Sequence, residues 1–331
     1  MEIWNAKISG TGGCLPGKPI SNQELIDKFN IASSDEWIKN NLGIETRHFA
    51  SEHEATSDIG ARAALNAISN ANISVNQIER ILLCTSTADW PSPPAASKLQ
   101  KLIGAHCPAE DKNCSCAGFI FGLDHAIRLV ATGLRHVLVI GADVKSRFIR
   151  NDDFRLLPIF ADGAGAVVVS QNNNGSGFID CILWTRGENY NNIITPAGGS
   201  ALPASIDTIE KNMHTVTLNV EGKIIFRDAV NGMTELCKEI ISKNNLKFSD
   251  VDIFIPHQAN FQIMKEVADN LQIPIHKLIN TIRESGNIVS GTVPLALHKA
   301  FENKIISSGK IILMCAVGAG YSGGAALYRV P

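Results

Sequence analysis

The sequence of 331 residues predicts an α/β fold made of two similar halves. Three observations support this prediction. Stretches with helical periodicity alternate with short apolar runs, two of these runs recur at nearly the same offset, and a polar, turn-rich stretch lies between the repeats. The length suits two packed units of roughly 150 residues each. Apolar residues make up 45% of the chain, which is enough for a large core.

Four apolar runs are the expected strands of the core. Continuous apolar runs suit strands that are covered on both faces, as in sheets with helices on either side. The four runs are residues 81–84, 137–140, 253–255 and 311–314.

The spacing of these runs indicates a duplication. The segment 78–86 is matched by 250–258 at an offset of 172, and 134–143 is matched by 308–318 at an offset of 174. Two nearly equal offsets favour a repeated unit, although any α/β protein repeats strand and helix.

The boundary between the halves is expected in the polar stretch 172–177, which is rich in Asn, Gly and Ser. We therefore divide the chain into an N-terminal half, residues 1–171, and a C-terminal half, residues 172–331.

Helix starts follow from local signals. Residues 33–36, Ser-Ser-Asp-Glu, indicate a capping box ahead of Trp37. Apolar residues recur at helical spacing after Ser57. Residues 91–94 contain three prolines and cannot lie inside a helix, so the next helix is expected to begin near Ala95.

Composition excludes several classes of function. Thirty basic residues against 32 acidic ones give a net charge of −2, and no stripe of Lys and Arg suggests a nucleic-acid partner. No apolar run reaches the ~18 residues of a membrane span. Residues 1–4 lack the basic-then-apolar pattern of a signal peptide. We expect a cytoplasmic protein that does not associate with membranes.

Eight cysteines occur without a C-x-x-C pair, so neither a metal site nor a disulfide framework is expected. Cys116 differs from the others because it precedes a predicted buried helix, residues 120–129, which ends before Gly133. The N-terminus of a helix favours the thiolate, the nucleophilic form of cysteine. A packing role is the alternative, and for an isolated cysteine it is the more common one.

Partners for a cysteine nucleophile are expected in the second half. His257 follows the apolar run 253–255, and sites collect at strand ends in α/β folds. Adding the repeat offset to Cys116 reaches a point one to three positions from Asn287, so we expect Asn287 opposite the cysteine, ahead of a helix from about Pro294. Its amide can donate to an oxyanion, although Gly-Asn is also common turn chemistry.

The glycine-rich segment 317–325 directly follows what we take to be the last buried strand. Glycines allow a backbone to approach a ligand closely, but the segment does not match the P-loop pattern for phosphate. A backbone N–H from this loop, together with that of Cys116, is a candidate oxyanion hole.

Taken together, these segments resemble the β-ketoacyl-acyl-carrier-protein synthase III family of thiolase-fold condensing enzymes. The resemblance covers nearly the whole chain, and each motif is weak alone whereas the ordered set is specific. The motifs are ISGTGGCLPGKPISNQEL, SSDEWIKNNLGIETRHFA, CAGF, FADGAGAVV, PHQAN, GN with TVPLAL, and the C-terminal glycine-rich loop. The resemblance implies a duplicated thiolase-like fold of five layers, αβαβα, with two pseudo-symmetric halves.

The resemblance also implies roles for the site residues. Cys116 matches the acyl-accepting nucleophile, and the backbone N–H groups of Cys116 and Ala319 match the oxyanion hole. His257 and Asn287 match the pair that stabilises the enolate formed when a malonyl thioester loses carbon dioxide. Acyl-CoA or an acyl carrier protein is the implied partner, no metal or separate cofactor is implied, and a homodimer is expected.

Substrate-binding residues are implied less firmly, because the chain departs from the family pattern. Asn41 and Gln262 stand where arginines are expected, and Asp269 with Asn270 replaces a pair of lysines, whereas Arg227 is kept. These changes favour a specialised pathway over housekeeping fatty-acid initiation, with CoA or an altered carrier as donor. The residues implied to bind substrate are Trp37, Phe154, Arg155, Gly222, Phe226 and Asn260.

Three alternatives stay open. The first is an acyltransferase on the same scaffold that forms an ester or amide. The second is a thiolase, which requires another reactive cysteine near the last loop, but Cys315 precedes Gly318 by three positions and should lie on the other face of its strand. The third is an inactive scaffold that dimerises with an active relative.

Overall fold

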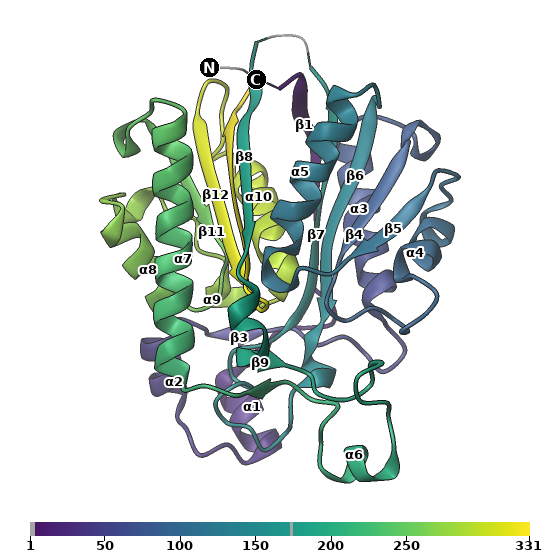
Figure 1. Ribbon diagram of the computed structural model, residues 1–331, viewed down its shortest axis with the longest axis vertical. Coiled ribbons are helices and arrows are strands. Elements are labelled where there is room, and N and C mark those ends of the chain that lie inside the picture. The colour runs from purple at the N-terminus through teal and green to yellow at the C-terminus, as the bar shows by residue number, and fades with distance from the viewer. Residues whose placement is uncertain (1–3, 173–174) are drawn as a thin grey trace.

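The computed structural model describes residues 4–172 and 175–331, and it confirms the duplicated α/β fold. Two sheets stand side by side, with helices between them and helices on the outer face of each (Figure 1). The layers therefore follow the expected order αβαβα. Residues 1–3, used above to argue against a signal peptide, and residues 173–174 of the turn-rich stretch lie outside the described residues.

The first sheet has five strands in the spatial order β1-β7-β6-β4-β5. β7 is antiparallel to both β1 and β6, whereas β4 is parallel to both β6 and β5. The two predicted strands of this half are confirmed as parts of β4 and β6. The bounds are β1 Ala6–Cys14, β4 Arg80–Cys84, β5 Ala109–Lys112, β6 His136–Val144 and β7 Asp162–Gln171.

The second sheet repeats this order, with β8, β13, β12 and β11 in the places of β1, β7, β6 and β4. The pairing directions also match, because β13 is antiparallel to both neighbours and β11 is parallel to β12. At the place of β5 a single parallel bridge joins Phe254 to Leu278. The bounds are β8 Gly177–Thr185, β11 Ile253–Pro256, β12 Ile311–Gly318 and β13 Ser322–Arg329.

The glycine-rich segment 317–325 is mostly strand, so the prediction of a loop after the last strand was wrong. Only residues 319–321 form the turn between β12 and β13. The glycines serve close packing: a Cβ at Gly323 would lie 2.6 Å from the Trp184 ring, and one at Gly324 would lie 2.6 Å from Ile120. Small residues are therefore required where β13 meets its neighbours.

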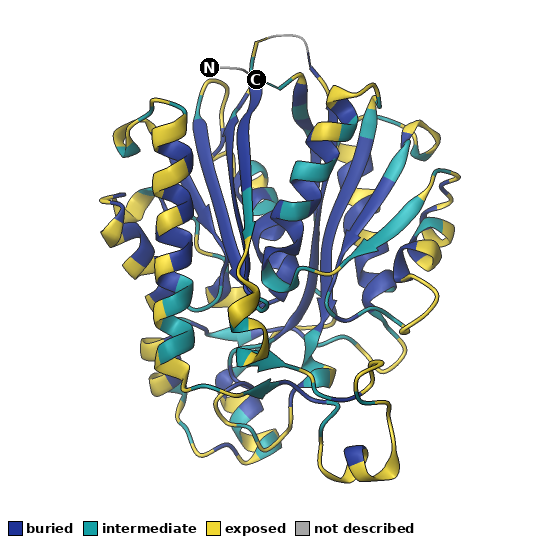
Figure 2. Ribbon diagram, viewed as in Figure 1, coloured by how far each residue is buried: buried dark blue, intermediate teal, exposed yellow. Residues whose placement is uncertain are grey.

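Six helices complete the layers around three apolar cores. One core fills the space between the sheets, and the other two lie beneath the outer helices. Figure 2 shows the strands of both sheets mostly buried, apart from the edge strand β5, which is of intermediate burial, and a line of exposed residues along the outer side of α7. The bounds are α3 Thr56–Asn70 and α4 Ala95–Ile103 outside the first sheet, α5 Gly118–Ala131 and α10 Thr292–Glu302 in the centre, and α7 Gly222–Lys243 and α8 Phe261–Asn270 outside the second sheet.

Shorter elements close one end of the molecule, below both sheets in Figure 1. The predicted capping box at residues 33–36 was wrong in register. The N-cap is Ser34, whose Oγ accepts from Trp37 N at 3.1 Å, so Glu36 falls one position short of the place that the box requires. The short elements are α1 Asn22–Phe29, α2 Asp35–Leu42, α6 Ile206–Glu210, α9 Ile282–Ser285, β2 Ile20–Ser21, β3 Thr46–Arg47, β9 Ile193–Ile194 and β10 Thr217–Leu218.

The boundary between the halves at residues 171 and 172 stays a prediction, supported by the end of β7 at Gln171 and the start of β8 at Gly177. Over residues 4–172 and 175–331, no helix combines the length and apolarity that crossing a bilayer requires.

Candidate active site

Cys116 lies in a tight 3-10 turn, Ser115–Ala117, that leads directly into α5. Ser115 has a positive φ of 48°, and its backbone N donates to Asn113 Oδ1 at 3.3 Å. Ala117 N in turn donates to Cys114 O at 3.1 Å. The turn therefore fixes Cys116 at the N-terminal end of a helix in the central layer, as predicted.

The end of β12 packs directly on this turn. A Cβ at Gly318 would lie only 2.6 Å from Cys116 N and 3.0 Å from Ala117 N, so this position accepts glycine alone. The positive φ of the adjoining hairpin turn, 133°, falls on Gly320 and not on Ala319. The backbone of Ala319 thus needs no glycine, and the turn that carries it lies beside the Cys116 N–H, as the predicted oxyanion hole requires.

Two opposing effects act on the Cys116 thiol. Burial raises its pKa to about 12, and the positive charge of Lys145 acts in the opposite direction. Cys116 nevertheless keeps some exposed surface, whereas Cys84 and Cys237 are fully buried. Cys116 is thus more accessible to a reagent than these two.

His257 comes immediately after β11, and its backbone N donates to Cys315 O in β12 at 2.7 Å. Its ring Nδ1 lies 2.7 Å from Thr292 Oγ1, at the start of α10. The residue is 3% exposed, and burial lowers the pKa of the imidazole to about 3. The ring is therefore neutral at physiological pH, with Nε2 left for a ligand.

Asn287 is held in place by backbone and side chain together. Its backbone N donates to Ile159 O at 2.9 Å, and its O accepts from Ala161 N at 3.0 Å. Its side-chain Oδ1 accepts from Val289 N at 2.9 Å. Because Oδ1 is occupied, the Nδ2 group is the part of the amide that remains for donation.

The 3-10 turn Val289–Gly291 joins the histidine to the asparagine. Thr292 Oγ1 contacts His257 Nδ1 at 2.7 Å and lies 3.1 Å from Val289 O, while Val289 N donates to Asn287 Oδ1. Gly118, two residues after Cys116, packs on the same turn, since a Cβ there would lie 3.7 Å from Ser290 Cβ. The segments that carry all three predicted catalytic residues thus meet around this turn.

The prediction that Asn287 lies at the pseudo-symmetric position opposite Cys116 was wrong. The turn Val289–Gly291 is the counterpart of Ser115–Ala117, so the residue equivalent to Cys116 is Ser290. Asn287 is instead the counterpart of Asn113. The two repeat offsets, 172 and 174, differ by two residues, so they could not locate the counterpart of Cys116 to a single position.

Thr292 and Ser290 were not anticipated as site residues. Thr292 is 35 positions from His257 in the sequence, and Ser290 contacts Asp143 of β6, 147 positions away. No local sequence pattern predicts contacts between residues so far apart in the chain. Thr292 lies inside the quoted motif TVPLAL, which is the only signal that pointed near it.

The implied substrate-binding residues are spread over several surface elements. Trp37 on α2 is 50% exposed and Phe154 is 57% exposed, so both aromatic rings are accessible. Arg155 already pairs with Asp153 at 3.0 Å. Asn260 caps α8, its Oδ1 accepting from Ile263 N at 2.8 Å.

Gly222 and Phe226 both lie on α7. Gly222 begins the helix, and a Cβ there would meet open space. Phe226 is half-buried and packs against the core beneath α7 and α8. Substrate contacts of these six residues stay predictions.

Cys315 does not face the site. Along β12, Ile312, Met314 and Ala316 belong to the core between the sheets, whereas Cys315 belongs to the outer core with Cys237. The predicted opposite orientation is confirmed, and it removes the second cysteine that the thiolase alternative requires.

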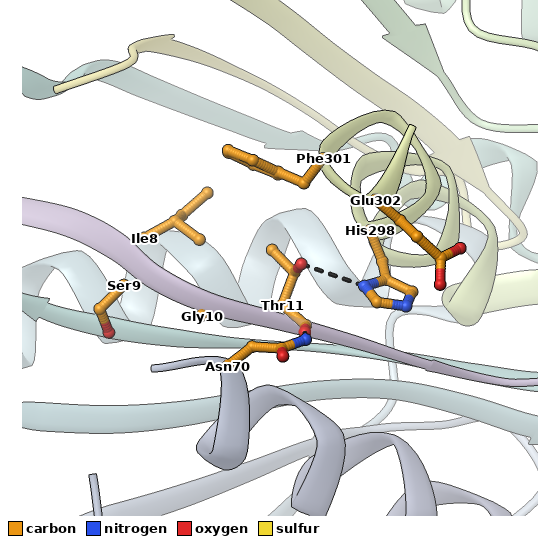
Figure 3. A pocket seen from close by; sticks show the side chains of 8 residues that line it. All are labelled: Ile8, Ser9, Gly10, Thr11, Asn70, His298, Phe301 and Glu302. Carbon is orange, nitrogen blue, oxygen red and sulfur yellow. Dashed lines mark hydrogen bonds between the residues drawn. The ribbon is translucent and has the colours of Figure 1, made fainter. Parts of the chain in front are cut away.

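A pocket elsewhere in the molecule contains none of the predicted site residues. Figure 3 shows its lining, from β1, the end of α3 and α10, and the hydrogen bond between Thr11 Oγ1 and His298 Nδ1 at 3.1 Å. His298 therefore has a hydrogen-bonding partner within the fold.

Known proteins match the chain over nearly its full length. The model of the 3-Oxoacyl-[acyl-carrier-protein (ACP)] synthase III family matches residues 111–187, and the model of its C-terminal part matches residues 241–330. Beta-ketoacyl-[acyl-carrier-protein] synthase III of Rickettsia bellii is 37% identical over 98% of this chain and 99% of its own, and that of Solibacter usitatus is 38% identical over 98% of both.

A solved structure shows the same likeness in three dimensions. The 3-oxoacyl-[acyl-carrier-protein] synthase III from Aquifex aeolicus superposes with a TM-score of 0.88 at 33% identity, covering 98% of this chain and 99% of that one. With these matches and the arrangement around Cys116, the chain belongs to the 3-oxoacyl-[acyl-carrier-protein] synthase III family of condensing acyltransferases.

Proposed function

We propose that the protein transfers an acyl group from a thioester to Cys116 and condenses it with a malonyl thioester that loses carbon dioxide. A β-keto thioester is the other extender considered, and it forms its enolate by losing a proton from the carbon between its two carbonyl groups, because it has no carboxylate to lose. The observation that carries the proposal is the series of close polar contacts from His257 through Thr292 and Val289 to Asn287, with the Cys116 turn packed beside it. This series fixes two hydrogen-bonding side chains at the N-terminus of α10, next to the N-terminus of α5.

In the first step the Cys116 thiolate attacks the carbonyl carbon of the acyl thioester. The new C–S bond forms as the carbonyl oxygen takes up negative charge, and the N–H groups of Cys116 and Ala319 hold that oxygen. The bond to the carrier sulfur then breaks, and the carrier leaves as a thiol after gaining a proton. The product of this step is a thioester on Cys116.

In the second step an extender thioester loses carbon dioxide. The electrons of the breaking C–C bond form an enolate, whose oxygen accepts hydrogen bonds from His257 Nε2 and Asn287 Nδ2. The enolate carbon attacks the acyl-Cys116 carbonyl, and the thiolate of Cys116 leaves. Burial keeps the His257 ring neutral. A neutral ring with its proton on Nε2 suits this role because it donates a hydrogen bond to the enolate oxygen without transferring the proton.

For Nε2 to donate, Nδ1 of His257 must accept, and Thr292 Oγ1 must give its single proton to the ring. The 2.7 Å contact to Nδ1 is shorter than the 3.1 Å contact to Val289 O, which supports this direction. Thr292 is therefore a positioning residue that selects the tautomer of His257.

The donor is an acyl-CoA or an acyl carrier protein, and the charges at the positions that depart from the family pattern bear on the choice. Arg227 pairs with Asp228 at 3.0 Å, and Lys265 pairs with Asp269 at 2.7 Å. Gln262 donates to Asn40 O instead of presenting a charge. Paired charges attract an acidic carrier weakly, which favours a CoA-borne donor and a specialised pathway.

A homodimer is part of the proposal. β5 is the edge strand of the first sheet, and beside it α5 presents the half-buried side chains of Phe121, Asp124 and His125. An unpaired strand edge next to a partly apolar helix face is suited to pairing with a second copy of the chain. Light scattering coupled to size-exclusion chromatography tests this, with a mass of twice 35.6 kDa expected.

A cytoplasmic location is proposed as well. All eight cysteines are free thiols, which is the usual state of cysteine in a reducing compartment.

The experiment that tests the proposal is product analysis. The enzyme is incubated with an acyl-CoA panel and malonyl-CoA or malonyl-carrier, and products are identified by mass spectrometry. The proposal predicts a carbon–carbon product with release of one carbon dioxide per turnover. An ester or amide that retains the malonyl carboxylate would contradict it and would support the alternative acyltransferase.

A further inference from the structure

Lys145 interacts electrostatically with Cys116, and among the described residues it has no ion-pair partner. It directly follows β6, which contacts α5 in the central layer (Figure 1). Along β6, Ile140, Ala142 and Val144 face the outer core beneath α3 and α4. The alternate residues Gly141 and Asp143 face the turn Val289–Gly291. Lys145 begins the 3-10 turn Lys145–Phe148 that follows directly, and it is close enough to Cys116 for the two groups to interact electrostatically.

The nearest carboxylate is already engaged. Asp143 is fully buried and accepts from Ser86 N at 2.8 Å, Ser290 N at 3.1 Å and the hydroxyls of four Ser and Thr side chains. These hydroxyls belong to Thr85, Ser86, Thr87 and Ser290. Asp143 therefore has little capacity left to accept from a lysine.

Within the described part of the chain, the Lys145 ammonium has no ion pair or hydrogen bond, and it acts on Asp143 and Cys116 only through space. Its one defined contact is with Phe148, whose ring centroid lies 5.7 Å from Nζ. Lys145 is half-buried, and this loss of solvent lowers the pKa of its ammonium, because a desolvated charge without a partner is unfavourable. An anion placed beside it would remove much of that penalty.

Acylation changes what the lysine faces. In the free enzyme the Cys116 thiolate can face the ammonium, but after acyl transfer the sulfur is a neutral thioester. The acyl chain begins at that sulfur, so a short chain extends into the region that the Lys145 charge reaches. An alkyl chain would leave the half-buried charge unpaired, whereas a chain that ends in a carboxylate would pair with it.

We propose that Lys145 selects acyl donors that carry a carboxylate, so that the priming substrate is a thioester of a short dicarboxylic acid. This inference rests on the proposed acyl transfer to Cys116 and names the class of its substrate. Lys145 contacts the acyl group and determines specificity, while the bonds made and broken are those of the first step described above.

The first test uses two alkylating reagents that differ in charge. Iodoacetate and iodoacetamide both form an S–C bond with Cys116 and release iodide, but only iodoacetate is an anion. The ratio of their rates at Cys116, measured by peptide mapping, cancels any change in thiolate content. We expect Lys145→Met to lower the iodoacetate-to-iodoacetamide ratio roughly tenfold, and Lys145→Arg to retain it.

Lys238→Met is the matched control, because it removes one positive charge from the exposed side of α7 and should leave the ratio unchanged. Replacing an unpaired, half-buried charge by methionine removes a desolvation cost, so the fold should tolerate it. Lys145→Gln serves as the neutral variant if the methionine variant does not fold. An unchanged ratio in folded Lys145→Met would overturn the role of Lys145.

The second test measures acylation itself. Intact-protein mass spectrometry follows adduct formation from succinyl-CoA, butyryl-CoA and pentanoyl-CoA. Succinyl-CoA should react fastest with the wild type, and Lys145→Met should reverse the preference. Faster reaction with butyryl-CoA in the wild type would overturn the inference while leaving acyl transfer intact. If no thioester acylates Cys116 in any variant, the proposed function fails and the substrate assignment fails with it.

Discussion

Asn113 and Asn287 make the same hydrogen bond in the two halves of the molecule. Oδ1 of Asn113 accepts from Ser115 N at 3.3 Å, and Oδ1 of Asn287 accepts from Val289 N at 2.9 Å. Both donor residues have a positive φ, 48° and 54°. Each asparagine therefore stabilises a tight turn at the start of a central helix, but only Asn287 is buried.

Replacing Asn287 separates its structural role from its chemical role. Asn287→Ala removes both the acceptor for Val289 N and the Nδ2 donor, so both stability and decarboxylation should fall. The loss of one donor to the enolate should lower the decarboxylation rate by ~3 kcal/mol, or roughly 100-fold. Release of carbon dioxide and thermal unfolding measure the two effects.

Asn287→Asp is the matched variant, because its carboxylate still accepts from Val289 N. It should keep more of the stability than Asn287→Ala while losing decarboxylation to a similar extent. Normal decarboxylation in either variant would show that Nδ2 does not serve the enolate.

Thr292 should act through His257. Thr292→Val removes the hydroxyl that supplies a proton to Nδ1, so the tautomer with a donating Nε2 is no longer favoured. We expect decarboxylation to fall at least roughly tenfold, while acyl transfer to Cys116 changes little. Thr292→Ser keeps the hydroxyl and should restore the rate. Equal losses in the serine and valine variants would indicate a packing role instead.

Gly318 should tolerate no side chain. Because a Cβ there would lie 2.6 Å from Cys116 N, Gly318→Ala must displace the turn or β12. A displacement near the reacting atoms should lower acyl transfer roughly 100-fold. Gly187→Ala is the control, since a Cβ at Gly187 meets nothing within 4 Å. Adduct formation of Gly318→Ala at the wild-type rate would refute the proposed placement of the oxyanion hole.

The buried imidazole of His257 should make stability depend on pH. Its pKa falls from an ordinary 6.5 to about 3 in the folded protein, so between these values the unfolded chain binds the extra proton. Stability should therefore decrease as the pH falls below 6.5, by up to about 1.4 kcal/mol per pH unit from this residue.

The pH dependence is measured by denaturant unfolding of the wild type and of His257→Gln between pH 7 and pH 4.5. The glutamine variant lacks this proton-linked term and should lose less stability over the range. Identical pH dependence in the two proteins would mean that His257 titrates in the folded state near its ordinary value.

Periodicity and spacing predicted a duplicated α/β fold, four central strands and the helix after Cys116, because buried strands and helices leave local patterns. The order of the layers followed from the family resemblance. Periodicity and spacing did not predict β13, because its glycines and alanines are typical of a loop. The need for small residues becomes apparent only from the side chains of Trp184 and Ile120, which pack against Gly323 and Gly324. The position opposite Cys116 was missed for a related reason. Repeat offsets locate a segment to within about two residues, whereas a hydrogen-bonded turn has an exact register.

The candidate site was identified largely from the family resemblance, which pointed to Cys116, His257 and Asn287. The roles of Thr292 and Gly318, which help to hold these three residues in place, could not be predicted from the sequence. Their roles depend on contacts between segments that are far apart in the sequence and show no local periodicity.

The most direct measurement of the central claim is intact-protein mass spectrometry after incubation with acyl-CoA. A covalent acyl group on Cys116 should add the mass of one acyl unit to the wild type, and peptide mapping should place it on this residue. The Cys116→Ala variant should acquire no adduct, while variants of the buried Cys84 and Cys237 should acquire it normally. An adduct that persists in Cys116→Ala, or a wild type that none of the acyl-CoA donors modifies, would contradict the account.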